Sequence, residues 1–169
     1  MHSKSYRFLT PLIMVLTWAN MEAQTSHPVP RLVVNVTIDQ LRTDYMEAFS
    51  SLFGAGGFNK VMRDGRSYMD AAYPFSHIDR ASAVACIMTG TVPYDNGIVG
   101  EHWMDRKTLR PMYCVDDATC EGWLTSEKYS PVALNVSTVT DELKMATGGR
   151  ALVYSIAPDA DAAILAAGH

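Results

Sequence analysis

The sequence predicts an α/β fold built around a mainly parallel sheet. Two apolar runs, 32–38 and 151–157, have the composition of strands that are buried on both faces. Between them lie amphipathic or small-residue stretches of helical length, which end at glycines such as Gly54, Gly65 and Gly90. This alternation is typical of βα units, in which parallel strands are joined by helices.

The composition indicates a globular chain and excludes several classes of protein. With 169 residues, of which 48% are hydrophobic and 19% charged, the chain is neither disordered nor of low complexity. Its length suits one domain or a part of a larger one. The 14 basic and 18 acidic residues give a formal net charge of −4. This balance argues against binding to duplex nucleic acid or to an anionic membrane surface, both of which need a concentrated basic face.

Residues 1–23 have the three parts of a secretory signal peptide. Lys4 and Arg7 form a basic start, an apolar run follows over 8–19, and Ala23 is a small residue suited to cleavage. The run is too short to cross a bilayer as a helix. We therefore expect an exported protein, periplasmic or secreted, with a mature chain from residue 24 to 169; a buried N-terminal helix is the alternative.

In the first half of the mature chain, helices are expected to follow the first strand. A helix is expected over 41–53, closed by Gly54, and a shorter one over 56–63. A strand is then expected over 67–72, with its aromatic residues facing inward.

The middle of the chain predicts a helix, a loop and a hairpin. The small-residue run 80–88 reads as a helix that packs closely on a sheet and ends at Gly90. Residues 91–100 carry turn signals, and 103–113 predicts a hairpin whose turn lies near Asp105.

Towards the end, Ser137 or Thr138 is expected to cap a helix that runs to residue 146, since Asp141 stands three residues after Thr138 as in a capping box. After the apolar strand 151–157, we expect a further strand over 162–165.

The expected export matters for the three cysteines, because disulfides form in oxidising compartments. Cys114 and Cys120 flank a polar loop and could form a disulfide or remain free; both alternatives stay open. A zinc site built on them would need two further ligands, and the sequence offers none nearby. Cys86 lies in an apolar run and is expected to be a buried thiol.

Acidic residues follow both apolar runs. Asp39 comes directly after the first, and Asp159 and Asp161 come after the second. Because the carboxyl ends of parallel strands meet at one edge, these carboxylates could share a divalent cation there. The alternatives are helix capping by Asp39 and a solvated turn for the other two.

The start of the expected helix at Arg80 is a second candidate site. A helix N-terminus offers free N–H groups and a partial positive charge, which suit a phosphate or sulfate and would assist a hydroxyl nucleophile. Polar residues are concentrated here, namely Ser76, His77, Asp79, Arg80 and Ser82. The alternative is an ordinary helix capped by Asp79.

Several ordered motifs resemble the alkaline phosphatase superfamily, in particular its type I phosphodiesterase/nucleotide pyrophosphatase branch with the secreted phosphate-irrepressible alkaline phosphatases. The motifs lie in 36–45, 56–58, 89–98, 137–143 and 163–169. The resemblance implies an α/β/α sandwich and a two-zinc site that hydrolyses phosphate mono- or diesters. It implies that Asp39 is the first metal ligand and that the other ligands lie beyond residue 169. The chain is then the N-terminal part of a larger domain.

The residues at the implied phosphate positions depart from the family pattern. The nucleophile position falls on Arg80, whose guanidinium stays protonated and cannot attack phosphorus. Ser82 is a substitute two residues along, about 200° around a helix. The position of the phosphate-binding asparagine is Glu101, and the Lys-x-Arg clamp falls on Asp159 and Asp161. Carboxylates at these positions would repel a phosphate.

Three functions remain open. The first is an exported, metal-dependent hydrolase of phosphate mono- or diesters with an altered nucleophile. The second is a degenerate member that binds a small anionic ligand without hydrolysing it, with Arg80 holding the anion. The third is a secreted structural or interaction domain stapled by its cysteines. The substrate and the oligomeric state are left open by the sequence.

Overall fold

The computed structural model describes residues 29–169, so the predicted signal peptide at 1–23 lies outside the described residues. The chain divides into two units, one up to Val34 and one from Asn35 to His169. Residues 29–34 of the first unit carry no helix or paired strand. Between residues 29 and 169, no helix combines the length and apolar character needed to cross a membrane.

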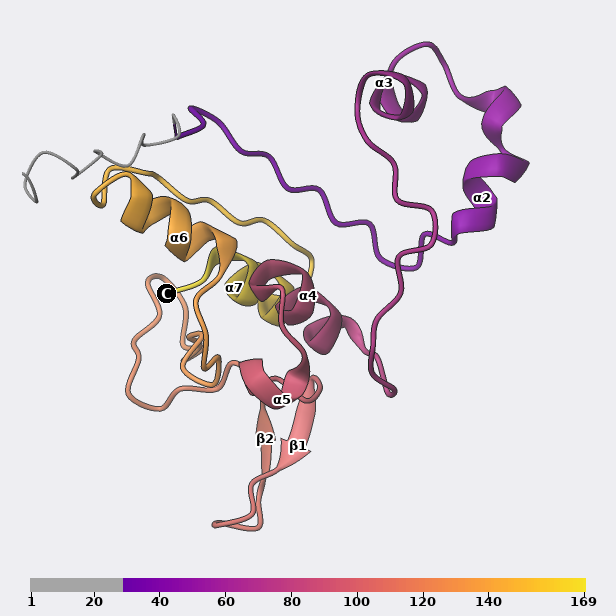
Figure 1. Cartoon of the computed structure of the whole chain (residues 1–169). Helices are drawn as coiled ribbons and strands as arrows, with labels where there is room; N and C mark the ends of the chain where they lie inside the picture. The colour runs from indigo at the N-terminus through magenta and orange to yellow at the C-terminus, as the bar shows by residue number, and fades with distance from the viewer. Residues whose placement is uncertain (1–28) are drawn as a thin grey trace, which may run out of the picture. The chain divides into compact units, whose positions relative to one another are not determined.

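Short helices follow the first apolar run, as Figure 1 shows. The helix expected over 41–53 is divided into α2, Thr43–Ala48, and the 3-10 helix η1, Ser50–Leu52. The predicted second helix is confirmed as α3, Gly57–Asp64. Gly65 ends α3, and its N–H donates to the carbonyl of Val61.

The small-residue run forms α4, Arg80–Thr89, as predicted. Asp79 is the N-cap, and Asp79 and Ser82 make a reciprocal capping box. The helix ends at Gly90, which has a φ of 69° that other residues rarely adopt. Within the loop that follows, one further turn of helix, α5, spans Pro93–Asn96.

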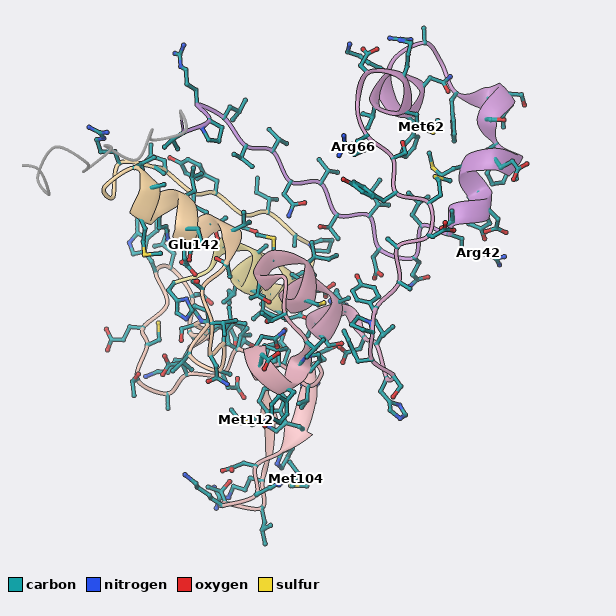
Figure 2. All side chains as sticks on the ribbon, in the orientation of Figure 1. Arg42, Met62, Arg66, Met104, Met112 and Glu142 are labelled. Atoms are coloured by element: carbon teal, nitrogen blue, oxygen red, sulfur yellow. The ribbon has the colours of Figure 1, made fainter. Side chains whose placement is uncertain are left out.

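The predicted hairpin is confirmed. Strand β1, His102–Met104, pairs antiparallel with β2, Pro111–Tyr113, so that Trp103 faces Met112. Figure 2 shows Met104 and Met112 on the two strands. The turn is held by the Asp105 carboxylate, which accepts hydrogen bonds from the backbone of the two residues that follow Arg106.

Two helices complete the chain. Helix α6, Val139–Ala146, begins at the predicted capping box of Thr138 and Asp141. The strand predicted over 162–165 is wrong, because these residues lie in helix α7, Ala160–Ala167. Alanine has the highest intrinsic helix propensity, and five of the eight residues of α7 are alanines, so the segment favours a helix unless a sheet captures it.

The predicted parallel sheet does not form among the described residues. Segments 32–38, 67–72 and 151–157 are not paired into any ladder; the strands in this part of the chain are β1 and β2. The prediction that 32–38 is buried is wrong here, since Val34 and Val36 are more than 70% exposed. Tyr68, expected to face inward, is also exposed. A strand needs partners for its backbone groups and cover for its faces, and local sequence provides neither.

The core lies between α4, α7 and the segments that follow the hairpin. Alanines on α4 and α7 allow the two helices to approach closely, which is why this contact is the most extensive between helices. The fully or nearly buried apolar residues are Ala81, Val84, Ala85, Met88, Ile98, Cys114, Val115, Leu134 and Leu165. The three cysteines are free thiols, so the disulfide left open by the sequence is absent from this structure.

Helix α7 should contribute strongly to stability through Leu165, which is fully buried. We expect Leu165→Ala to lower the free energy of unfolding by about 2–5 kcal/mol, because it removes buried methyl groups and leaves a cavity. Leu109→Ala, at a residue 74% exposed in the hairpin turn, is the control and should change it by less than about 0.5 kcal/mol. Urea denaturation followed by circular dichroism measures both; equal losses would contradict this account of the core.

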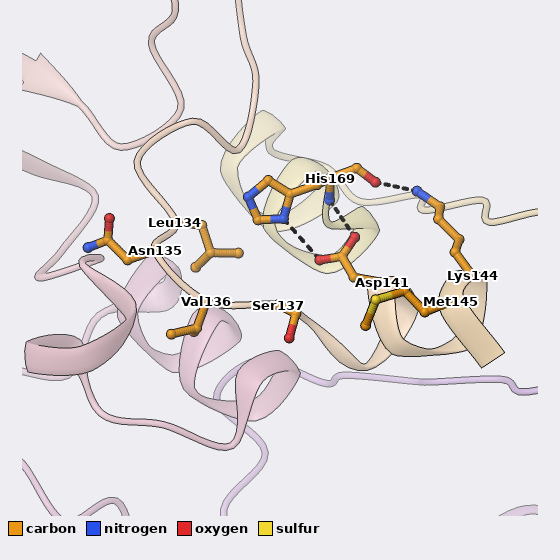
Figure 3. Close-up of a pocket in the computed structure, with 8 residues that line it drawn as sticks. All are labelled: Leu134, Asn135, Val136, Ser137, Asp141, Lys144, Met145 and His169. Atoms are coloured by element: carbon orange, nitrogen blue, oxygen red, sulfur yellow. Dashed lines mark hydrogen bonds and ion pairs between the residues drawn. The ribbon is translucent and has the colours of Figure 1, made fainter. Parts of the chain in front are cut away.

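A buried carboxylate ties the end of α7 to the start of α6. Asp141 accepts hydrogen bonds from Thr138, from the backbone N–H of His169 at 2.7 Å, and shares a 3.0 Å contact with the Nδ1 atom of His169. Figure 3 shows this pair. Burial alone would raise the pKa of Asp141, but the hydrogen bonds from His169 and Thr138 outweigh it and lower the pKa to about 2.

This pair should make folding sensitive to acid. The pKa of Asp141 in the folded chain, about 2, lies below its ordinary value of 3.8, so the ionised form stabilises the fold above pH 3.8. That stabilisation, roughly 2 kcal/mol, is lost as the pH falls through 2. We expect Asp141→Asn to flatten the stability profile between pH 4 and 2 in urea titrations. Asp70→Asn, at an exposed position, should keep the wild-type profile.

Candidate functional site

The side chain of Arg80 joins three carboxylates that are distant in the sequence. Its Nε and Nη2 atoms each lie 3.1 Å from an oxygen of Asp161, a bidentate pair. Its Nη1 atom lies 3.1 Å from Asp159, and Nη2 lies 3.3 Å from Glu101. We call these four residues the Arg80 cluster. The hydrogen bonds with Asp161, together with the charges of all three acids, raise the pKa of Arg80.

Asp161 is the buried centre of the Arg80 cluster. It is fully buried, and the hydroxyl of Tyr113 donates to its carboxylate at 3.2 Å while accepting its backbone N–H at 3.1 Å. Burial, with the nearby charge of Asp161, raises the pKa of Tyr113 to about 12, so this phenol stays a donor at neutral pH. The hairpin thus supplies, through Tyr113, a contact that the sequence did not indicate.

Asp79 occupies the N-terminus of α4. One carboxylate oxygen accepts the backbone N–H of Ser82 at 2.9 Å and its hydroxyl at 2.8 Å; the other accepts the N–H of Glu101 at 2.6 Å. Burial would raise the pKa of Asp79, but these hydrogen bonds more than offset it and lower the pKa. The alternative of an ordinary capped helix is therefore the one observed, and the backbone N–H of Ser82 already donates to a carboxylate.

The charge of this region is negative. The guanidinium of Arg80 is balanced against Glu101, Asp159 and Asp161, and Asp79 adds a further anion at the helix start. Each nitrogen of the guanidinium already contacts a carboxylate oxygen. An incoming phosphate would have to displace these oxygens and would meet uncompensated like charge.

The structure brings together four of the predicted site residues and leaves others apart. Arg80, Glu101, Asp159 and Asp161 converge, whereas Ser82 is fully buried with its hydroxyl engaged by Asp79. In this state the Ser82 hydroxyl has no access to a substrate. Asp159 is the exposed N-cap of α7, and Asp161 lies in its first turn and is fully buried, so the solvated turn that the sequence allowed is wrong for Asp161.

Asp39 lies in an exposed turn after the first apolar run. Within residues 29–169, no ion pair or hydrogen bond joins it to Asp159 or Asp161. The same part of the chain contains no group of three or more His, Cys, Asp or Glu side chains that could hold a metal ion. The described residues therefore do not form a site with three or more such ligands by themselves.

A cavity of about 380 Å³ lies away from the Arg80 cluster, and Figure 3 shows its lining. It is mainly apolar, with the Asp141–His169 pair and Lys144 at one side. The amine of Lys144 donates to the backbone carbonyl of His169, so it is already satisfied. This cavity could not be predicted from the sequence, because its walls come from the segment before α6, from α6 itself and from His169.

Comparison with known proteins shows relatives over nearly the whole described chain. Alkaline phosphatase PhoV of Synechococcus elongatus is 40% identical over 143 residues, covering 83% of this chain and 26% of PhoV. Alkaline phosphatase PafA of Elizabethkingia meningoseptica is 31% identical over 167 residues, covering 96% of this chain and 31% of PafA. The chain thus spans less than a third of the length of these relatives.

Solved structures agree with the sequence matches. Wild-type PafA superposes with a TM-score of 0.77 at 34% identity, over 85% of this chain and 28% of that one. This likeness confirms the predicted alkaline-phosphatase-like α/β fold class. A solved PafA mutant, with a TM-score of 0.72, has substitutions at a threonine, an asparagine, a lysine and an arginine. The first two are as far apart as Arg80 and Glu101, and the last two are separated by one residue, like Asp159 and Asp161.

The family model described as type I phosphodiesterase / nucleotide pyrophosphatase matches residues 33–164, which include the Arg80 cluster and α7 up to Ile164. With this match over most of its length, the chain belongs to the type I phosphodiesterase/nucleotide pyrophosphatase family of the alkaline phosphatase superfamily.

Proposed function

We propose that the chain is the N-terminal part of an exported family member whose phosphate site has become an internal ion cluster and does not hydrolyse phosphate esters. The observation that carries this proposal is the contact of Arg80 with all three acids at the remaining phosphate positions. A nucleophile is missing from the Arg80 position, and the substitute offered by the sequence, Ser82, is fully buried. These two observations favour the degenerate member over a hydrolase with an altered nucleophile.

The anion-holding role that the sequence suggested for Arg80 needs a free guanidinium. In the structure the guanidinium faces carboxylates on three sides, so we propose that these acids, supplied by the chain itself, take the place of a bound anion. Any ligand of this site is then expected to be neutral or cationic on the side that meets Glu101 and Asp159.

The proposal also includes export of the chain and a zinc site to which Asp39 contributes. Residues 1–23 support export to the periplasm or outside the cell. Asp39 is proposed as one ligand of a zinc site whose other ligands come from polypeptide outside this chain. Zinc there would act as a Lewis acid towards a bound oxygen.

A second function, phosphate-ester hydrolysis with a different nucleophile, is favoured by the names of the relatives, which are alkaline phosphatases. It requires Ser82 to leave the capping box and become accessible. The phosphate experiment below distinguishes the two functions.

Reversing the charge of the Arg80 cluster should increase the affinity of the chain for inorganic phosphate. The variant R80T/E101N/D159K/D161R replaces one cation and three anions by two cations, and we expect it to bind inorganic phosphate at least about tenfold more tightly than the wild type. Titration calorimetry at low ionic strength measures this affinity. The neutral variant R80M/E101Q/D159N/D161N is the matched control and should show a smaller gain, since it supplies no cation.

Two outcomes would oppose the proposal. Phosphate binding by the wild-type chain as tight as that of the reversed variant would show that the Arg80 cluster opens for anions. Hydrolysis of p-nitrophenyl phosphate by the wild-type chain, lost in Ser82→Ala, would establish the second function. Circular dichroism of each variant confirms that it is folded before the affinities are compared.

The Arg80 cluster should also be a source of stability. Arg80→Met leaves the buried Asp161 with Tyr113 as its remaining side-chain partner, and we expect a loss of about 2 kcal/mol or more in the free energy of unfolding. The double variant Arg80→Met/Asp161→Asn should recover part of this loss, because the uncompensated charge is gone.

The control for that experiment is Arg42→Met. Arg42 pairs with Asp44 at the surface, where both side chains are more than half exposed. The free energy of unfolding should therefore change by no more than about 0.5 kcal/mol. Denaturant unfolding measures all variants. A double variant less stable than Arg80→Met would contradict the uncompensated-charge explanation.

A further inference from the structure

The turn between β1 and β2 concentrates positive charge. We call residues 104–111 the hairpin tip; Figure 1 shows it at the free end of the two strands. It carries the cations Arg106, Lys107 and Arg110 and one carboxylate, Asp105. The three cations are exposed, and within residues 29–169 none of them takes part in an ion pair. The formal charge of the tip is therefore +2, although that of the whole chain is −4.

The one carboxylate of the tip is engaged by the turn itself. Asp105 accepts the hydroxyl of Thr108 at 2.6 Å and the backbone N–H of Lys107 at 3.0 Å. These two hydrogen bonds lower the pKa of Asp105, so it stays ionised at neutral pH and continues to hold the turn. The acid thus shapes the tip, and the three cations remain available to a partner.

The hairpin tip also exposes apolar side chains. Leu109 is 74% exposed and has a φ of 54°, a conformation that glycine adopts easily and leucine rarely. Met104 is 57% exposed. A leucine that is kept exposed in an unfavourable backbone conformation gains nothing from packing in the fold, which indicates a role for its side chain outside the fold.

The small size of the tip favours a lipid surface over a protein as its partner. A stable protein–protein interface takes roughly 800 Å² from each partner, which a single tight turn does not present. A bilayer sets no such requirement, because each cation near anionic headgroups and each inserted apolar side chain contributes separately. Cations next to exposed apolar residues are also the composition of segments that lie at membrane surfaces.

We propose that the hairpin tip binds the surface of an anionic phospholipid bilayer. Arg106, Lys107 and Arg110 contact the headgroup phosphates, and Leu109 inserts between the headgroups. This interaction does not involve the Arg80 cluster, so it stands or falls independently of whether the chain hydrolyses or binds phosphate esters.

Vesicle co-sedimentation tests the role of the cations. The chain from residue 24 to 169, which leaves out the predicted signal peptide, should bind vesicles of phosphatidylcholine with about 30% phosphatidylglycerol at low salt, and more weakly at high salt. The variant R106Q/K107Q should bind them at least about tenfold more weakly. The matched control R66Q/R150Q removes the same charge at two exposed positions outside the tip and should bind like the wild type.

A second pair of variants tests the inserted side chain. Leu109→Gly should bind at least about threefold more weakly, since the apolar group is lost. Its urea midpoint should be no lower than that of the wild type, because glycine accepts the positive φ. Leu124→Gly is the matched control: Leu124 is 87% exposed with a φ of 58°, but it lies between Glu121 and Glu127, which lipid anions would repel. It should bind like the wild type.

Four outcomes would overturn the proposal. The first is that the wild-type chain does not bind the anionic vesicles. The second is that R66Q/R150Q or Leu124→Gly weakens binding as much as the corresponding change in the tip. The third is equal binding to vesicles of phosphatidylcholine alone. The fourth is tighter binding to soluble poly-glutamate or to inorganic phosphate than to the vesicles, which would assign the tip to an acidic protein or a free anion.

Discussion

The bidentate pair between Arg80 and Asp161 is the interaction on which the rest of the folded unit depends. It joins the first residue of α4 to the first turn of α7 across 81 positions of sequence. The carboxylate of Asp161 is fully buried, so it is tolerable only while the guanidinium and the hydroxyl of Tyr113 face it. The requirement to satisfy this one charge fixes how α4, α7 and the hairpin meet.

The same requirement explains the small residues around the pair. Alanines on both helices let their backbones approach closely enough for a guanidinium at one helix start to reach a carboxylate at the other. Larger residues would fill the core equally well but would separate the two helix starts. Apolar packing and the ion cluster therefore constrain each other, and neither can be altered alone.

How much could be predicted from the sequence depended on whether the signal was local. Helices α4 and α6 were predicted closely because their caps, Asp79 with Ser82 and Thr138 with Asp141, lie within four residues. The hairpin was also predicted from a local signal, the turn near Asp105. The strand predicted over 162–165 was wrong because alanine runs carry a helical preference that only a surrounding sheet could override. Segments 32–38 and 151–157 can form strands only if other strands pair with them, and such pairing depends on residues that are distant in the sequence.

The candidate site shows the same division. The positions of Arg80, Glu101, Asp159 and Asp161 could be singled out from the family resemblance, but the sequence interpretation treated Arg80 as free to hold an anion. Nothing local indicates that its partners would be acids 21 or more residues away, and nothing indicates Tyr113, which is 48 positions from the carboxylate it contacts. The site could be located from the sequence, whereas its charge balance required the structure.

That charge balance also bears on how such a site could arise. A carboxylate introduced alone at position 161 would face a bound phosphate and, once the anion left, would remain buried without a cation beside it. An arginine introduced alone at the start of α4 would lack partners in the same way. Together, Arg80 and the acids compensate one another in part, because each nitrogen of the guanidinium meets a carboxylate oxygen. The residues of the Arg80 cluster are therefore physically coupled, since a change at one of them alone leaves the charge of another without compensation.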